Sequence, residues 1–198
     1  MSLWEGPMTR QNGVRVFGIM GSPRLGGNTD VLLSEALRGA ASVGAATVKV
    51  DLVRRDVRPC TGCDGCAKTG VCVIDDAMAE LLDEMFASDV WILGTPVYWW
   101  GPTAQMKAFI DRWYAGWQTA DGRAQMAKRI GLISPFGDSE PETARHIVGM
   151  LEDAAAFLKA DFAGQLLVTA DRPGEVAGNA KAMRDAFDLG RKLASFTD

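Results

Sequence analysis

The sequence predicts an α/β protein in which five parallel strands form one doubly wound sheet with helices on both faces. Two observations support this fold class. Short apolar runs rich in β-branched residues recur along the chain, and each is followed by a stretch whose apolar residues have helical spacing. No repeat, low-complexity segment or linker divides the 198 residues. We therefore expect a single domain at residues 14–198, after a loose N-terminal tail at residues 1–13.

The first half of the chain alternates between strand and helix. Residues 14–20 form a short apolar run that ends at a glycine and predicts a buried strand. Residues 28–40 follow with a Thr/Asp N-cap signal and helical spacing, and residues 46–53 alternate like a strand. After a cysteine-cluster loop at residues 59–73, residues 75–88 open on acidic residues that suit a helix N-terminus.

The second half continues this alternation. Residues 89–94 predict a third buried strand, and a helix is expected from Pro102, because proline suits the first helical turn. Residues 129–137 predict the fourth strand and its exit loop. A long amphipathic helix, a fifth strand and a last helix are expected over residues 141–160, 163–170 and 175–196.

The composition excludes several classes of protein. The net charge is −4 and the Lys and Arg residues are scattered, whereas a nucleic-acid or anionic-membrane surface would need a basic face. No apolar run reaches the roughly 18–20 residues of a membrane span. The N-terminus also lacks the charged-then-apolar order of a signal peptide. We therefore expect a cytoplasmic protein that binds neither nucleic acid nor membrane.

The loop after the first strand, GSPRLGGNT at residues 21–29, has the parts of an anion site. Ligands of doubly wound sheets bind beyond the carboxyl ends of the strands. The glycines let backbone N–H groups turn inward just before a helix N-terminus, although the loop matches neither the Walker A nor the dinucleotide pattern. A terminal monophosphate suits this loop, and the alternative is a plain strand-to-helix turn. Its polar side chains are Ser22, Arg24, Asn28 and Thr29.

Two more strand-end loops are candidates for a ligand site. The loop GTPVYWWGPT at residues 94–103 places Tyr98, Trp99 and Trp100 directly after the third strand. Aromatic side chains there can pack against a planar ligand, and the alternative is that they belong to the core. The loop SPFGDSE at residues 134–140 follows the fourth strand.

All four cysteines lie in one stretch, CTGCDGCAKTGVC at residues 60–72. A chain of this size needs no disulfides, and clustered cysteines in a cytosolic protein more often bind metal or serve as redox groups. Three cysteines within seven residues form a ferredoxin-type pattern, whereas structural zinc sites usually take two separated pairs. Zinc, and thiols or a disulfide without metal, remain the alternatives.

These three motifs, in this order, resemble the NAD(P)H-dependent FMN reductases of the flavodoxin-like superfamily, and within that group the iron–sulfur flavoproteins. The resemblance covers roughly residues 14–137 and implies the strand order 2-1-3-4-5. It implies that Ser22, Arg24, Asn28 and Thr29 hold the FMN phosphate, that Pro96, Val97, Tyr98 and Trp99 line the isoalloxazine, and that Ser134, Phe136 and Gly137 flank the ring. It also implies one [4Fe–4S] cluster on Cys60, Cys63, Cys66 and Cys72. The nearby cations are candidates to offset the cluster's charge, and the alternative is that they are simply solvated; they are Arg54, Arg55, Arg58 and Lys68.

The resemblance implies an FMN-dependent oxidoreductase in which the flavin carries the chemistry. No catalytic residue is assigned, because no acid–base set is evident and the only histidine, His146, lies on the polar side of a helix. Electrons would come from NAD(P)H or a ferredoxin-like protein and pass to a small acceptor such as a quinone or an oxygen species. A homodimer or homotetramer is also implied. The alternatives are a flavodoxin-like electron carrier without its own substrate, and a metal-binding redox sensor or interaction module.

Overall fold

The sheet of the computed structural model confirms the predicted fold class. The structure describes residues 13–195, and within them five parallel strands pair in the predicted order β2-β1-β3-β4-β5. The winding reverses between β1 and β3, where doubly wound sheets bind their ligands. The strands are β1 (Arg15–Met20), β2 (Ala46–Asp51), β3 (Val90–Gly94), β4 (Arg129–Phe136) and β5 (Asp161–Thr169).

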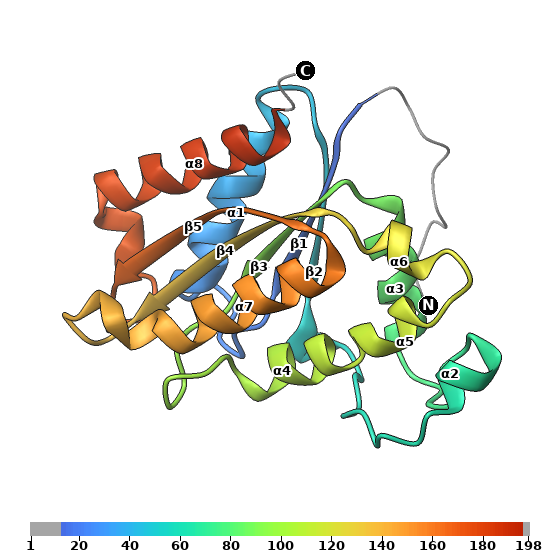
Figure 1. The fold of residues 1–198 in the computed structure, drawn as a ribbon. Coiled ribbons are helices and arrows are strands. Elements are labelled where there is room, and N and C mark those ends of the chain that lie inside the picture. Colours follow the sequence, from blue (N-terminus) through green and yellow to red (C-terminus); the bar gives the residue numbers. More distant parts are fainter. Residues whose placement is uncertain (1–12, 196–198) are drawn as a thin grey trace.

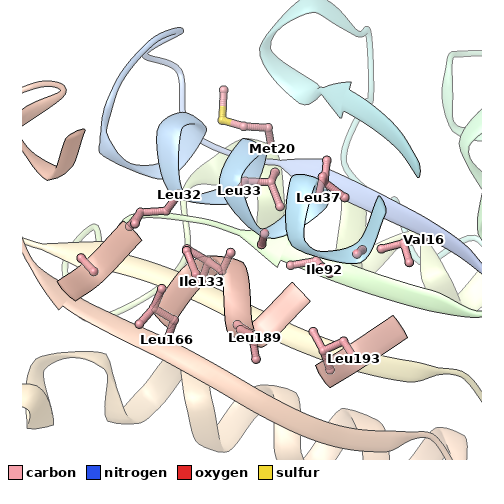
Figure 2. Packing of buried hydrophobic residues seen from close by; sticks show 14 of the residues in the cluster. Val16, Met20, Leu32, Leu33, Leu37, Ile92, Ile133, Leu166, Leu189 and Leu193 are labelled. Carbon is pink, nitrogen blue, oxygen red and sulfur yellow. The ribbon is translucent and has the colours of Figure 1, made fainter. Parts of the chain in front are cut away.

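Helices cover both faces of the sheet (Figure 1). On one face lie α1 (Asn28–Ala41) and α8 (Ala180–Ala194), and the buried cluster in Figure 2 fills the space between these helices and the strands. The second cluster lies beneath α3 (Met78–Ala87), α4 (Ala104–Asp111), α5 (Trp113–Trp117) and α7 (Arg145–Leu158). No helix within residues 13–195 is long and apolar enough to cross a membrane.

Short elements occupy several of the connections between the main helices and strands. The helix α2 lies in the cysteine-cluster loop, and α6 follows α5 in the chain (Figure 1). The short elements are α2 (Gly65–Thr69), α6 (Gly122–Gln125) and 3₁₀ turns at Leu52–Arg54, Pro141–Ala144 and Glu175–Gly178.

The predicted boundaries in the first half differ where local hydrogen bonds intervene. Gly27 is the N-cap of α1, with no side-chain cap, and the Asp30 carboxylate instead accepts the Gly26 N–H at 2.7 Å. The helix expected over residues 75–88 starts at Met78, whose N–H donates to Asp76 at 3.0 Å. The strand expected over residues 46–53 ends at Asp51, where the 3₁₀ turn begins.

Boundaries in the second half also shift at caps. The helix expected from Pro102 begins at Ala104, because the Thr103 hydroxyl accepts the Met106 N–H. The helix expected over residues 141–160 starts as a 3₁₀ turn and ends at Leu158. The last predicted helix is divided at Asn179, which caps α8. Residues 1–12 of the expected tail, and residue 196 of the last helix, lie outside the described residues.

Helices α1 and α8 approach each other closely at two glycines. A Cβ at Gly190 would overlap the carbonyl oxygen of Ala36 and lie 2.9 Å from its Cα. A Cβ at Gly39 would overlap the carbonyl oxygen of Phe187. Because the obstacles are backbone atoms, this helix spacing requires glycine at both positions.

Candidate functional site

The carboxyl ends of the strands enclose a cavity of about 180 Å³, which we call the strand-end cavity. The loops after β1, β3 and β4, which the sequence singled out, all contribute to its wall, and the loop after β5 completes it. The lining residues are Ser22, Arg24, Gly27, Asn28 and Thr29, then Pro96, Val97 and Tyr98, then Pro135, Phe136 and Gly137, and finally Ala170, Asp171 and Pro173.

One end of the strand-end cavity is built to receive an anion. Ser22 and Thr29 are buried there, whereas Arg24 is exposed at its edge. The first N–H groups of a helix have no intrahelical partner, and α1 starts here without a side-chain cap. These N–H groups and the helix dipole favour a negative charge. The residues therefore fit a phosphate.

The acidic residue in the first turn of α1 is neutralised by a neighbour. Asp30 forms an ion pair with Lys49 of β2. Burial alone would raise the pKa of Asp30, but hydrogen bonds from Lys49 and the Gly26 N–H outweigh it and lower the pKa. The paired carboxylate therefore opposes anion binding less than an isolated one would.

Hydrogen bonds between loops fix the floor of the strand-end cavity. The Thr103 hydroxyl donates to the Gly21 carbonyl at 2.6 Å, and the Thr103 N–H donates to Thr95 Oγ1 at 3.1 Å. The Val97 N–H donates to the Pro135 carbonyl at 3.2 Å. The loops after β1, β3 and β4 are thus held in one fixed arrangement.

Asn28 joins the first loop to the loop after β5. Its Nδ2 donates to the Arg172 carbonyl at 2.9 Å, and its Oδ1 accepts the Val176 N–H at 3.4 Å. The amide therefore holds the two loops together at the cavity wall. Sequence reasoning missed Ala170, Asp171 and Pro173, because that loop carries neither an aromatic cluster nor a glycine-rich pattern.

Two predicted site residues lie outside the wall of the strand-end cavity. Trp99 is 92% exposed, and Ser134 is fully buried with no hydrogen-bond partner for its hydroxyl among the described residues. His146 is exposed on α7 and lines neither this cavity nor the one formed by the cysteines.

Trp99 and Trp100 form the tip of a tight turn. Tyr98 and Gly101 exchange two backbone hydrogen bonds of 2.8 and 3.0 Å, and Trp99 and Trp100 both have positive φ, at 50° and 59°. Two-residue turns of this kind strongly prefer Asn-Gly, and a bulky residue with positive φ is strained. The hydrogen-bonded turn keeps both indoles out of the core despite this strain, contrary to the alternative of a buried aromatic cluster.

Replacing Trp99 with asparagine is expected to raise the free energy of unfolding by roughly 0.5–1 kcal/mol. Asparagine tolerates the left-handed conformation, and the exposed indole loses little packing. Urea unfolding followed by circular dichroism measures the change. Val43→Asn is the matched control, since Val43 is also an exposed apolar residue but has no positive φ. An equal gain in both variants would show that relief of exposed apolar surface, and not of backbone strain, is responsible.

The four cysteines line a second cavity, which we call the cysteine cavity, together with Arg112 and Tyr114. Cys60 and Cys63 are exposed, Cys66 is buried, Cys72 is half-buried, and none of the four forms a disulfide. No group of three or more His, Cys, Asp or Glu residues within residues 13–195 is placed to hold a metal ion. The donor set consists of thiols, which are the ligands that iron–sulfur clusters take.

The thiols differ in their electrostatic surroundings. Hydrogen bonds from the Gly65 N–H and the Thr61 hydroxyl lower the pKa of Cys63. Burial raises the pKa of Cys66, and the neighbouring Cys72 raises it further. Cys63 is therefore the more readily ionised thiol of these two.

Arg112 closes the cysteine cavity from the end of α4. Its side chain is 1% exposed and forms a two-pronged ion pair with the buried Asp76, with Nη1–Oδ2 at 2.8 Å and Nη2–Oδ1 at 3.1 Å. Burial alone would lower the pKa of Arg112, but Asp76 and, to a smaller extent, Cys72 raise it. The cations expected near the cluster, Arg54, Arg55, Arg58 and Lys68, do not line this cavity.

The sheet order and the strand-end cavity define a flavodoxin-like protein. Residues 14–160 match the model of the NADPH-dependent FMN reductase family, and the chain belongs to that family.

Individual relatives agree with this assignment. An iron-sulfur flavoprotein of Archaeoglobus fulgidus is 34% identical over 184 residues, which are 91% of this chain and 79% of the relative. The iron-sulfur flavoprotein MJ1083 of Methanocaldococcus jannaschii is 43% identical over 99 residues, and the chain spans about half of its length. The NAD(P)H:quinone oxidoreductase of Methanothermobacter marburgensis shares the fold, with a TM-score of 0.72 at 15% identity over 94% of this chain and 98% of that one.

Proposed function

We propose that the chain binds FMN in the strand-end cavity and passes electrons from NAD(P)H, or from a ferredoxin-like protein, to a small acceptor such as a quinone or an oxygen species. We also propose that Cys60, Cys63, Cys66 and Cys72 ligate one [4Fe–4S] cluster. The observation that carries the flavin part is the convergence of the loops after β1, β3 and β4 on one cavity, whose wall holds both the polar residues of the first loop and the Pro96–Val97–Tyr98 segment.

Different residues of the strand-end cavity would bind the phosphate and the ring of FMN. Ser22, Arg24 and Thr29, with the N-terminus of α1, would bind the phosphate, and Asn28 would keep the loop after β5 in place. Pro96, Val97 and Tyr98 would line the isoalloxazine, and Phe136 and Gly137 would flank the ring. Trp99, at the exposed turn, would meet the acceptor or a second subunit. Ser134 lies buried in β4 and would act through the packing beneath the site.

Bound FMN supplies both hydride and single-electron transfer. The chain itself orients the ring with stiff walls, because Pro96 and Pro135 have fixed backbones and main-chain hydrogen bonds connect their loops. It also excludes water from the phosphate end, where Ser22 and Thr29 are buried. Since no residue of the cavity wall is a histidine or a cysteine, no proton carrier of that kind is assigned there.

Helix α4 connects the two cavities. Thr103, its N-cap, donates to Gly21 beside the strand-end cavity, and Arg112, its C-cap, lies in the wall of the cysteine cavity. Eight helical residues span about 12 Å. One rigid helix would therefore fix the separation between flavin and cluster within one chain.

A homodimer or homotetramer is part of the proposal. Tyr98, Trp99 and Trp100 are exposed beside the strand-end cavity, and a second copy of the chain would cover them. Sedimentation is expected to give a multiple of the 21.3 kDa chain mass. A mass of one chain would contradict this part alone.

The test is anaerobic purification followed by an absorption spectrum, iron and sulfide analysis, and assays of NADH and NADPH oxidation with a quinone acceptor. Bound flavin, four irons per chain and acceptor-dependent turnover are expected. Flavin without turnover of any small acceptor would favour the electron-carrier alternative. Failure to take up FMN, with metal retained, would favour the sensor or interaction module and refute the flavin site.

A further inference from the structure

We propose that Arg112 is a positioning residue of the iron–sulfur site, which clamps both ends of the cysteine-cluster loop and donates its Nε–H to a sulfur of that site. The inference rests on the proposed cluster and extends it to a residue far from the cysteines in the sequence.

The clamp is made by the two Nη groups. Nη1 donates to the Arg58 carbonyl at 2.9 Å and to Asp76, and Nη2 donates to Asp76 and, at 3.5 Å, to the Ile74 carbonyl. Arg58 lies two residues before the first cysteine, and Ile74 lies two residues after the last. One guanidinium therefore closes the base of the loop that carries all four thiols.

These contacts use all four Nη hydrogens, and the remaining donor has no acceptor. The Nε atom of Arg112 is buried and has no hydrogen-bond partner among residues 13–195. The side chain that carries it lines the cysteine cavity. A buried donor left unpaired costs about 1–3 kcal/mol. The other side chains of that cavity include the four cysteines, so a thiolate or a cluster sulfide is the acceptor that the site would supply.

The position of this charge has a consequence for redox behaviour. A cation held without solvent beside an anionic cluster stabilises the reduced form, because reduction adds negative charge, and so raises the reduction potential. The other candidate cations differ in this respect. All four are exposed, so water screens their charges, and the three arginines also pair with carboxylates; they are Arg54, Arg55, Arg58 and Lys68.

The test compares anaerobically reconstituted wild type, Arg112→Met, Arg112→Lys, Asp76→Asn and Lys68→Met. Readouts are iron per chain, the midpoint potential of the cluster by EPR-monitored titration, and thermal unfolding of the cluster-free protein. Arg112→Met is expected to shift the potential to more negative values and to lose iron severalfold faster, and Arg112→Lys should restore part of the potential. Asp76→Asn removes the ion pair that holds the guanidinium but leaves its charge in place, so it should lower thermal stability without making the potential more negative. Lys68→Met should match wild type in every readout.

A measurement on the wild type covers the case in which Arg112→Met fails to fold. Protein labelled with ¹⁵N only in arginine is expected to show hyperfine coupling between one arginine nitrogen and the reduced cluster. Absence of this coupling, or a wild-type potential in Arg112→Met, would overturn the inference while the cluster stands. Wild type that takes up no cluster would refute the proposed cluster itself, and with it the Nε contact, before any variant is compared.

Discussion

Replacing Gly190 with alanine is expected to lower the free energy of unfolding by about 3 kcal/mol or more. The added Cβ would overlap the backbone carbonyl of Ala36, and a backbone atom moves only if α1 and α8 separate along their length. Overpacking of a tight contact typically costs about 1–3 kcal/mol, and more where the obstacle is rigid. Since small domains have about 5–15 kcal/mol of stability in total, one methyl group should remove a large share. Urea unfolding measures the loss.

Gly149→Ala is the matched control for this prediction. Gly149 lies within α7, and a Cβ there would meet no atom within 4 Å. Alanine in an open helix position is expected to stabilise the protein by about 0.5–1 kcal/mol, because glycine is a poor helix former. Opposite signs for the two variants would establish that helix spacing decides the outcome. If Gly190→Ala instead changed the free energy of unfolding with the same sign and size as Gly149→Ala, α1 and α8 would not be in backbone contact at Gly190.

The fold was predictable because its signals are local. Each strand is a short apolar run and each main helix has helical spacing, so alternation alone leads to a doubly wound sheet. The strand order came from the family resemblance, since periodicity does not specify which strands pair. Helix ends were less predictable, because the caps at Gly27, Thr103 and Asn179 depend on single side chains or on their absence.

The site residues that lie within one sequence motif could be predicted, whereas those that the fold brings together from distant positions could not. Ser22 and Thr29 lie in a loop whose composition suggests an anion. Arg112 looks like an ordinary helix residue in the sequence, and its contact with Arg58 spans 54 positions. Trp99 was expected to line the isoalloxazine, and the hydrogen bonds between Tyr98 and Gly101 hold it in an exposed turn outside the wall of the strand-end cavity. A Trp-Trp pair gives no sequence signal for such a turn.

The double variant Ser22→Ala, Thr29→Val is expected to weaken FMN binding by about 100-fold or more, with little change in riboflavin binding. Both hydroxyls are buried at the phosphate end of the strand-end cavity. A hydrogen bond to a charged group contributes about 1.5–3 kcal/mol, so the loss of two corresponds to at least two factors of ten. Valine keeps the methyl group that packs near Gly94, so the helix start should be preserved.

Riboflavin separates this effect from a damaged fold, because it has the same ring and ribityl chain but no phosphate. Fluorescence quenching titrations of both flavins give the two affinities for each protein. Thr47→Val, which makes the same kind of change on the exposed surface of β2, should bind both flavins like wild type. If the double variant lost affinity for riboflavin as much as for FMN, the hydroxyls would be supporting the cavity as a whole, and the phosphate would have to bind elsewhere.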